Sequence, residues 1–540
     1  MDTEAYPGKG LSLSQLVFAL NEELKRKECF SSRVRSQWPV CEYTDVSYRL
    51  TLDNFSQLER DTSAALATIR DWINSFAPIN RLPTDVLFLI STHLPHQGDH
   101  FRVTFVCRHW RRTFLQHAGL WSHLDLSKGE VYLKTLLERA RDSPLSILAN
   151  DTEPVGDVNL LPLHAKRITD IKFTDRNGAV IQRFLEISGA VGLRELRLHS
   201  RGTALLSTLV FPNLTFFKLT AARMDWFCGP ELLDFLEAST MLRTVRMKIY
   251  TDTMLEDIPQ ERVAVLHNVE NFCLVTSEGA LGYKISTHIS CPSAKHTSLT
   301  HARSGGEYPT NPQEIFPASA FWKAIIRQYT RSPIEEVTFE TTTNSDSWIA
   351  CSLSFRSADA ATIELRFEVA NNLGLPERSF AEMYSEVFLE ASRAIRDLPL
   401  LANVKRIHMC GPRDLVQEGI ESTVTEIGEL LKSLGPLDEL TISRCDIQPY
   451  IYPFLHQTTY GPKESVTYPP IRVLTISNPS DMVGEDAVAG LVKLARVQHE
   501  LGVPFERMVI RTHDPPADIE ERLRPWVGLV DCCGMPYEGD

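Results

Sequence analysis

Three histidines lie close together in the sequence, and imidazole is a common zinc ligand. His93, His96 and His100 are separated by three and four residues. Zinc also needs a fourth ligand and a fixed turn to hold it, and we identify nothing nearby that supplies them. A solvated loop is therefore the favoured interpretation. We predict neither a metal site nor a cofactor.

The 11 cysteines are scattered along the chain, and no Cys-x-x-Cys pair occurs. Cys532 and Cys533 are adjacent and could serve redox chemistry or a metal, whereas unreactive thiols are the alternative. An odd number of dispersed cysteines favours a reduced protein. We therefore expect an intracellular protein, in the cytoplasm or the nucleus.

Familiar catalytic motifs are missing from the sequence. It contains no G-x-x-x-x-G-K-[S/T], no G-x-S-x-G and no H-E-x-x-H. The carboxylate pairs Glu335–Glu336 and Glu520–Glu521 are adjacent, so their side chains do not face each other on a helix. We predict a non-catalytic protein. The alternative is an enzyme on an unrecognised fold.

The basic segment Arg108–Arg112 contains a tryptophan, a combination also found in nucleic-acid-binding segments. The whole chain of 540 residues nevertheless has 56 Lys and Arg against 69 Asp and Glu, a net charge of −13. Such a chain gains little from phosphate backbones, so we predict no nucleic-acid partner. No stretch approaches the roughly 18 apolar residues of a membrane span, so we predict no membrane partner.

The N-terminal part has helical periodicity. We expect residues 1–53 to form a loosely ordered extension and residues 54–79 to contain a helix with apolar positions at three- and four-residue steps. Pro78 ends that helix because it has no amide proton to donate. Two more helices are predicted, over Leu82–Leu94 and from about His100 to Gln116.

After about residue 120 a six-residue phrase recurs, with apolar residues at its first, fourth and sixth positions. Ile168–Phe173 (Ile-Thr-Asp-Ile-Lys-Phe) is a typical copy. The fourth and sixth positions share one face of a strand, and the first turns inward where the strand begins. Further copies begin at Leu193, Leu214, Leu242, Val269, Ile334, Val404, Leu437, Ile471 and Phe505, and Trp121 begins an opening copy.

Helical segments separate the copies and complete a strand–helix repeat. A short period of this kind is typical of leucine-rich repeats, although the steps of 33 and 34 residues after Val404 make these repeats irregular. Stacked units bury what a single unit cannot, so we predict an α/β solenoid with a curved parallel sheet. The predicted helices are Gly178–Ile187, Glu231–Ala238, Ala320–Tyr329, Phe380–Ile395, Val424–Leu434 and Ala487–Glu500.

Two long gaps interrupt the array. The stretch 276–315 is rich in Ser, Gly, His and Thr, which predicts a polar loop insertion. Within the second insertion, 345–370, the segments Cys351–Phe355 and Ile363–Val369 alternate strictly and flank a turn, which predicts a β-hairpin. Two more irregular repeats are the alternative.

The residues from 82 to 121 resemble the F-box. Leu82-Pro83, the paired apolar residues that follow, and Val106-Cys107-x-x-Trp110 match the order and spacing of that family over about forty residues. Asp85 stands where Glu is usual. The lead-in Ala77–Arg81 resembles that of F-box proteins from mushroom-forming fungi. The resemblance divides the chain into an F-box domain at 80–126 and a leucine-rich-repeat-like domain at 127–540.

The resemblance implies a function as the substrate-recognition subunit of an SCF-type ubiquitin ligase. F-box domains bind a Skp-type adaptor, which bridges to a cullin, while a distal repeat domain holds the protein substrate. We expect an interface anchored by Trp110 and Leu87. Carried over by position, the residues that form the core or face the adaptor are Leu82, Pro83, Val86, Leu87, Ile90, Val106, Cys107 and Trp110.

The alternative is a repeat scaffold outside any ligase, in which the F-box-like helices pack only within the chain and cap the solenoid. Complete burial of Leu87, Val106 and Trp110 would favour that reading. For the substrate we expect the concave face of the sheet to form the site. The polar third positions of the phrases mark it: Asp170, Glu195, Thr244, Glu336, Arg406 and Glu439.

Overall fold

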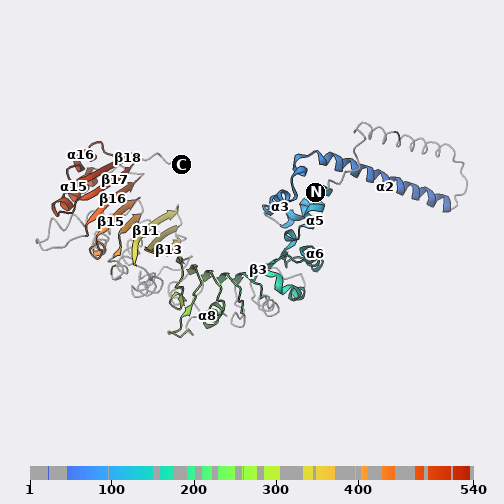
Figure 1. Cartoon of the computed structure of the whole chain (residues 1–540), viewed down its shortest axis with the longest axis horizontal. Helices are drawn as coiled ribbons and strands as arrows, with labels where there is room; N and C mark the ends of the chain where they lie inside the picture. Colours follow the sequence, from blue (N-terminus) through green and yellow to red (C-terminus); the bar gives the residue numbers. More distant parts are fainter. Residues whose placement is uncertain are drawn as a thin grey trace, which may run out of the picture. The chain divides into compact units, whose positions relative to one another are not determined.

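The structure is a computed structural model of the 540-residue chain (Figure 1). The chain divides into two compact units, residues 1–115 and residues 116–540, and each is described by itself. The described residues are 22, 45–94, 97–149, 158–175, 191–200, 210–221, 229–249, 258–259, 261–276, 285–303, 333–344, 348–370, 396, 403–410, 429–443, 469–478, 485–512 and 515–534.

The first unit is helical. Its long helix α2 spans Asp45–Ser75, so residues 45–53 belong to a helix and not to the loosely ordered extension predicted from the sequence. No proline or glycine occurs between Asp45 and Ser75, and nothing therefore interrupts the helix. The 3-10 helix η1 (Pro78–Arg81) follows, with Pro78 in its first turn.

The F-box-like segment begins with helix α3 (Thr84–Thr92), for which Pro83 is the N-cap residue. The predicted helix from His100 to Gln116 is instead two helices, α4 (Gln97–Val103) and α5 (Arg108–Gln116). The break falls where β-branched and aromatic residues of low helix propensity follow one another. There the Thr104 hydroxyl donates a 2.7 Å hydrogen bond to the carbonyl of Phe101, which competes with a continued helix.

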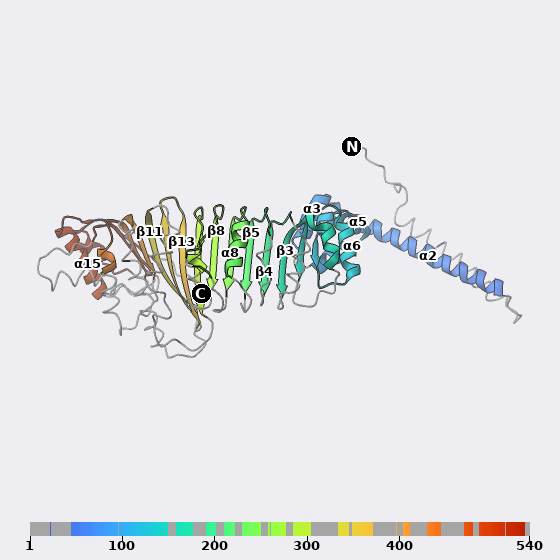
Figure 2. The same ribbon diagram turned by 90° about the horizontal axis from the view of Figure 1, so that it is seen from below.

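The second unit is built on a mixed sheet, of which the described residues form sixteen strands (Figure 2). All neighbouring pairs are parallel except β11–β12 and β12–β13. In spatial order the strands are β1 (His123–Asp125), β2 (Leu145–Ala149), β3 (Ile168–Asp175), β4 (Glu195–Ser200), β5 (Phe216–Ala221), β6 (Thr244–Ile249), β8 (Asn271–Thr276), β10 (His296–Arg303), β13 (Thr362–Ala370), β12 (Trp348–Ser357), β11 (Ile334–Asn344), β14 (Arg406–Cys410), β15 (Leu437–Ser443), β16 (Ile471–Asn478), β17 (Phe505–Thr512) and β18 (Val527–Gly534).

The α/β class and the large parallel sheet predicted from the sequence are confirmed. The antiparallel strands depart from the fully parallel sheet of the predicted repeat solenoid. They arise because β12 and β13 are joined by a tight turn, as the alternating pattern of the second insertion predicted. Cys351–Phe355 and Ile363–Val369 pair across that hairpin, with Leu353 opposite Leu365.

The six-residue phrase is explained by burial. Its first, fourth and sixth residues are buried in every copy, as at Ile168, Ile171 and Phe173. Strand pairing aligns the fourth positions into a continuous row, of which all but Val530 are buried. That row is Leu124, Ile147, Ile171, Leu196, Phe217, Val245, Phe272, Thr297, Ile363, Phe355, Val337, Ile407, Leu440, Leu474, Met508 and Val530.

The prediction of a polar loop at 276–315 is wrong for its described part. Strand β10 lies within it and pairs in parallel with both β8 and β13. The strand escaped the apolar pattern because Thr297 occupies the buried fourth position, where the other copies have an apolar residue. Threonine still suits a strand at this position because its side chain is β-branched.

Helices and a small second sheet complete the second unit. Helix α8 (Gly229–Ala238) lies on the face of the sheet to which the fourth positions point (Figure 1). The ring of Phe235 in α8 is 5.0 Å from that of Phe217, a fourth-position residue of β5. Helix α15 (Glu485–Glu500) also matches its prediction, and the remaining predicted helices lie largely or wholly outside the described residues. The other elements are η2 (Ala118–Trp121), α6 (Glu130–Ala140), η3 (Val158–Arg167), α16 (Ile519–Leu523) and the paired strands β7 (Ala264–Val265) and β9 (Ile289–Ser290).

Candidate functional site

A small core holds the helical unit together. Leu87 of α3 and Phe114 of α5 are fully buried, and the Trp110 ring lies 5.3 Å from that of Phe114 in an edge-on arrangement. The Trp110 indole nitrogen donates a 2.5 Å hydrogen bond to Oδ1 of Asn80, at the end of η1. A buried indole N–H needs such a partner, so Asn80 fixes the ring in place.

A second set of apolar side chains in this unit is exposed to solvent. Val86, Leu89 and Ile90 follow one another at i, i+3 and i+4 along α3, so they lie on one face of the helix. Leu89 is 59% exposed. Helix α3 therefore has two apolar faces. The face that contains Leu87 is buried in the core, and the face that contains Val86, Leu89 and Ile90 is exposed to solvent.

Two further exposed apolar residues lie in the break between α4 and α5. Phe105 is 72% exposed and Val106 is 58% exposed. The Arg111 guanidinium lies 5.5 Å from the centre of the Phe105 ring, and its Nε donates a 3.0 Å hydrogen bond to the carbonyl of Thr104. Arg111 therefore helps to hold this break in shape. We call Val86, Leu89, Ile90, Phe105 and Val106 the apolar surface.

The residues predicted to form the core or face the adaptor fall into both classes. Pro83, Val86, Ile90 and Val106 are exposed, whereas Leu82 and Cys107 are half-buried. The expectation that Leu87 and Trp110 anchor an interface is corrected, because both are buried within the chain and belong to the core. Val106 is exposed, so the complete burial that favours a closed scaffold is not observed.

Leu89 and Phe105 were missed from the sequence. The signal was available for Leu89, since it lies three residues after Val86 and therefore on the same face of α3. Phe105 lies within the segment that the sequence predicted as one continuous helix, from about His100 to Gln116. It is exposed because that helix is interrupted there.

One family model matches this part of the chain. Residues 79–127 match the F-box-like family. The chain thus contains an F-box-like domain, and domains of this family typically bind Skp-type adaptors in proteins that are generally non-catalytic. The match includes the whole apolar surface and continues to Leu120 and Trp121, which are buried. No curated protein matches the chain.

The third-position residues predicted to bind substrate lie side by side in two groups. Register places Asp170 next to Glu195 on β3 and β4, and Thr244 follows two strands later. Glu336, Arg406 and Glu439 are likewise neighbours on β11, β14 and β15. None of the six is buried, since their side chains point away from the apolar row.

Asp170 and Glu195 form a close carboxyl pair. Burial, together with the hydrogen bond and the negative charge of Glu195, raises the pKa of Asp170 to about 6. Arg197 and a 3.2 Å hydrogen bond from the Ser146 hydroxyl act in the opposite direction. The negative charge of Glu195 thus favours the protonated form of the Asp170 carboxyl group.

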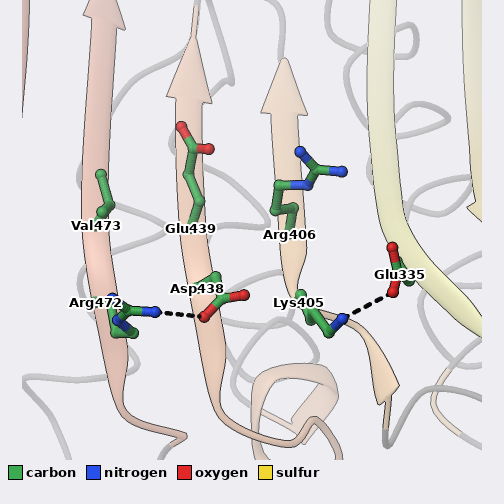
Figure 3. A pocket seen from close by; sticks show the side chains of 7 residues that line it. All are labelled: Glu335, Lys405, Arg406, Asp438, Glu439, Arg472 and Val473. Atoms are coloured by element: carbon green, nitrogen blue, oxygen red, sulfur yellow. Dashed lines mark hydrogen bonds and ion pairs between the residues drawn. The ribbon is translucent and has the colours of Figure 1, made fainter. Parts of the chain in front are cut away.

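Arg406 and Glu439 of the second group line an open hollow in which charges alternate (Figure 3). Lys405 Nζ lies 2.8 Å from Glu335, and Arg472 lies 3.2 Å from Asp438. Arg406 lies 3.2 Å from Glu336. The hydrogen bond that Lys405 donates to the Glu335 carboxylate raises the pKa of Lys405. The hollow is lined by Glu335, Lys405, Arg406, Asp438, Glu439, Arg472 and Val473.

The adjacent cysteines have the properties of unreactive thiols. A 3.2 Å hydrogen bond to Asp531 raises the pKa of Cys533, and burial raises that of Cys532. Both thiols therefore stay protonated at neutral pH, whereas a nucleophilic cysteine needs a lowered pKa.

The described residues contain no group of three or more metal-binding side chains, and His96 lies outside them. Within the same ranges no helix has both the length and the apolar character needed to cross a membrane.

Proposed function

We propose that this protein is the substrate-recognition subunit of an SCF-type ubiquitin ligase. The apolar surface of the F-box-like domain would bind a Skp-type adaptor and, through it, a cullin. The observation that carries the proposal is the exposure of the apolar surface within residues that match the F-box-like family. The protein itself supplies no catalytic group and positions its substrate for other subunits.

Physical chemistry supports a partner for the apolar surface. Removing apolar surface from water contributes about 25 cal/mol of favourable free energy per Å². Interface energy concentrates in aromatic and large aliphatic side chains near the centre of a contact. Phe105 and Leu89 are therefore the expected anchors, in place of the buried Trp110 and Leu87. Leu87 and Trp110 act indirectly, by fixing the helices that present them.

Co-purification of the full-length chain with a Skp-type adaptor tests the proposal. We expect the double variant Leu89→Asp and Phe105→Asp to weaken adaptor binding at least about tenfold, because two charges would have to be desolvated at the contact. The matched control is Val131→Asp, which also places a charge on an exposed apolar position, in α6 of the other unit. Adaptor binding that is equal in all three proteins would refute the proposal.

We further infer that the strands of the second unit act as irregular leucine-rich-repeat-like elements that hold a protein substrate. Their third positions alternate with the buried row and point to the opposite face of the sheet. An intracellular location, in cytoplasm or nucleus, and a fungal origin belong to the same proposal. They rest on the scattered cysteines and on the lead-in Ala77–Arg81.

A repeat scaffold outside any ligase is the second candidate, because Leu87 and Trp110 are buried, but the exposure of Val106 speaks against it. In that case the helical unit would serve only as a cap. The two candidates differ in solution: a ligase subunit recovers adaptor and cullin together from an extract, whereas a scaffold recovers neither. The Leu89→Asp and Phe105→Asp variant separates them, because a cap would lose nothing when its outer face becomes charged.

A further inference from the structure

A row of positive charges crosses the polar face of the sheet in its first half. Lys172, Arg197, Lys218 and Arg246 occupy the fifth position of four successive phrases. Strand pairing aligns them directly, Lys172 with Arg197, Arg197 with Lys218, and Lys218 with Arg246. We call these four residues the basic row.

The row is exposed to solvent and prearranged. Lys172 and Arg246 are exposed, while Arg197 and Lys218 are half-buried. Arg197 is held by a 2.7 Å ion pair with Glu195 and lies 5.1 Å from the centre of the Phe216 ring. Lys248 of β6 adds a further exposed cation two residues beyond Arg246.

Like charges on neighbouring strands repel each other. Adjacent strands are about 4.8 Å apart, and directly opposed like charges destabilise a sheet. Within the part of the chain that the structure describes, Lys172, Lys218 and Arg246 have no ion pair, and Glu195 neutralises only Arg197. Three of the four aligned cations therefore have no ion-pair partner among the described residues, although the whole chain has a net charge of −13.

We propose that the basic row binds an acidic, extended peptide segment of the substrate, which lies across strands β3 to β6. This inference deepens the proposed function, on which it rests, by naming the chemistry of the substrate. A string of anionic side chains would remove the repulsion along the row and form charge-assisted hydrogen bonds with its guanidinium and ammonium groups.

The dimensions define the segment. The row extends over three strand spacings, about 14 Å. An extended chain advances about 3.3 Å per residue and places every second side chain on one face. A segment of about five residues with anionic groups at alternate positions therefore spans the row. Carboxylate and phosphate groups share the required chemistry.

The test uses the full-length protein and fluorescence anisotropy with three labelled peptides of equal length. Their alternate positions carry glutamate, phosphoserine or glutamine. We expect the two anionic peptides to bind and the glutamine peptide not to bind, with affinity falling as salt screens the charges. Tighter binding of one anionic peptide then identifies carboxylate or phosphate as the natural group.

The decisive variant reverses two charges, Lys218→Glu with Arg246→Glu, and should weaken binding of the anionic peptides at least about tenfold. The milder Lys218→Gln with Arg246→Gln guards against misfolding and should show an intermediate loss. The matched control reverses two exposed cations elsewhere in the same unit, Lys128→Glu with Arg511→Glu, and should bind as the unaltered protein does.

Adaptor binding is measured on the same proteins, so the two proposals can fail separately. Charge-reversed protein that retains both adaptor and peptide binding would overturn the basic row as a site. Peptide binding through the row without any adaptor binding would uphold the row and refute the ligase. An oligonucleotide that displaces the peptide at lower concentration than unlabelled acidic peptide would also overturn the inference, in favour of a nucleic-acid ligand.

Discussion

The two halves of the sheet share one buried row but differ in how they arrange their exposed charges. Across β11, β14, β15, β16 and β17 the second positions alternate in sign, as Glu335, Lys405, Asp438, Arg472 and Glu506. Arg472 bridges to both Asp438 and Glu506. Across β3 to β6 the fifth positions are all positive.

The two charge arrangements suit different purposes: alternating charges stabilise the fold, whereas charges of one sign can bind a ligand. An alternating row satisfies its own charges, so it needs no partner and gains a modest network of exposed ion pairs. A row of one sign cannot do so, and it leaves its charges available to an outside ligand. Two of the third-position residues predicted to bind substrate, Arg406 and Glu439, thus line a hollow whose charges are largely paired within the chain. The basic row lies outside that hollow.

The largest expected effect tests whether the two halves share a core. Phe217 is in the buried row of the half that carries the basic row, and Leu474 is in the buried row of the half whose charges alternate. Both side chains are fully buried, and we consider the variants Phe217→Ala and Leu474→Ala. Each should lower the free energy of unfolding by about 2 to 5 kcal/mol, through lost burial and a residual cavity. Urea denaturation measures it. Leu529→Ala, at an exposed position, is the control and should change little.

A smaller effect distinguishes the halves by pH. The pKa of Asp170 is raised to about 6, above its ordinary value of 3.8, so the folded protein holds this proton more tightly than the unfolded chain does. The stabilisation that the Asp170 carboxyl group gives to the fold is therefore complete below the pKa of the unfolded chain. It is lost as pH rises through the pKa of the folded protein. We expect about 1 kcal/mol after solvent screening. Asp170→Asn should remove this decline between pH 4 and pH 7, measured by urea denaturation.

Glu506 provides the opposite sign in the other half. The hydrogen bond from Arg472 lowers the pKa of Glu506, so its contribution is present above the ordinary carboxylate pKa and is lost as pH falls. Glu506→Gln should thus flatten the acid side of the stability curve. A decline in the same direction for Asp170 and Glu506 would contradict the contrast between the two rows.

The smallest effect comes from swapping single charges. Lys218→Glu should stabilise the fold by about 0.5 kcal/mol, because it relieves like-charge repulsion with both neighbours. Arg472→Glu should destabilise it, because it places a third acid between Asp438 and Glu506. Thermal unfolding at low salt measures both changes. Destabilisation by Lys218→Glu would show that the basic row is already neutralised within the chain.

Several elements could be predicted from the sequence because their causes are local. Burial at the first, fourth and sixth positions follows from the period of a strand, and the hairpin of β12 and β13 follows from alternation on both sides of a turn. Strand β10 could not be found in this way, since Thr297 replaces the apolar residue that marks the other copies.

The exposed apolar residues of the F-box-like segment were only partly predictable. Helix α3 carries Val86, Leu87, Leu89 and Ile90 in close succession, and several of its faces are therefore apolar. Which face packs inward depends on what lies against the helix, here the core of Trp110 and Phe114. The F-box-like match depends on residue order and was visible, whereas the exposure of Phe105 was not.

The sequence by itself determined the recurring strand phrase, the helical N-terminal part and the F-box-like pattern, because each depends on spacing within a few tens of residues. Only the tertiary structure decided which apolar side chains meet solvent and which charges become neighbours. Lys172, Arg197, Lys218 and Arg246 are separated by 21 to 28 residues along the chain, and strand register alone brings them into one row. Electrostatic repulsion depends on the distance between charges in space, and the order of residue types along the chain does not give that distance.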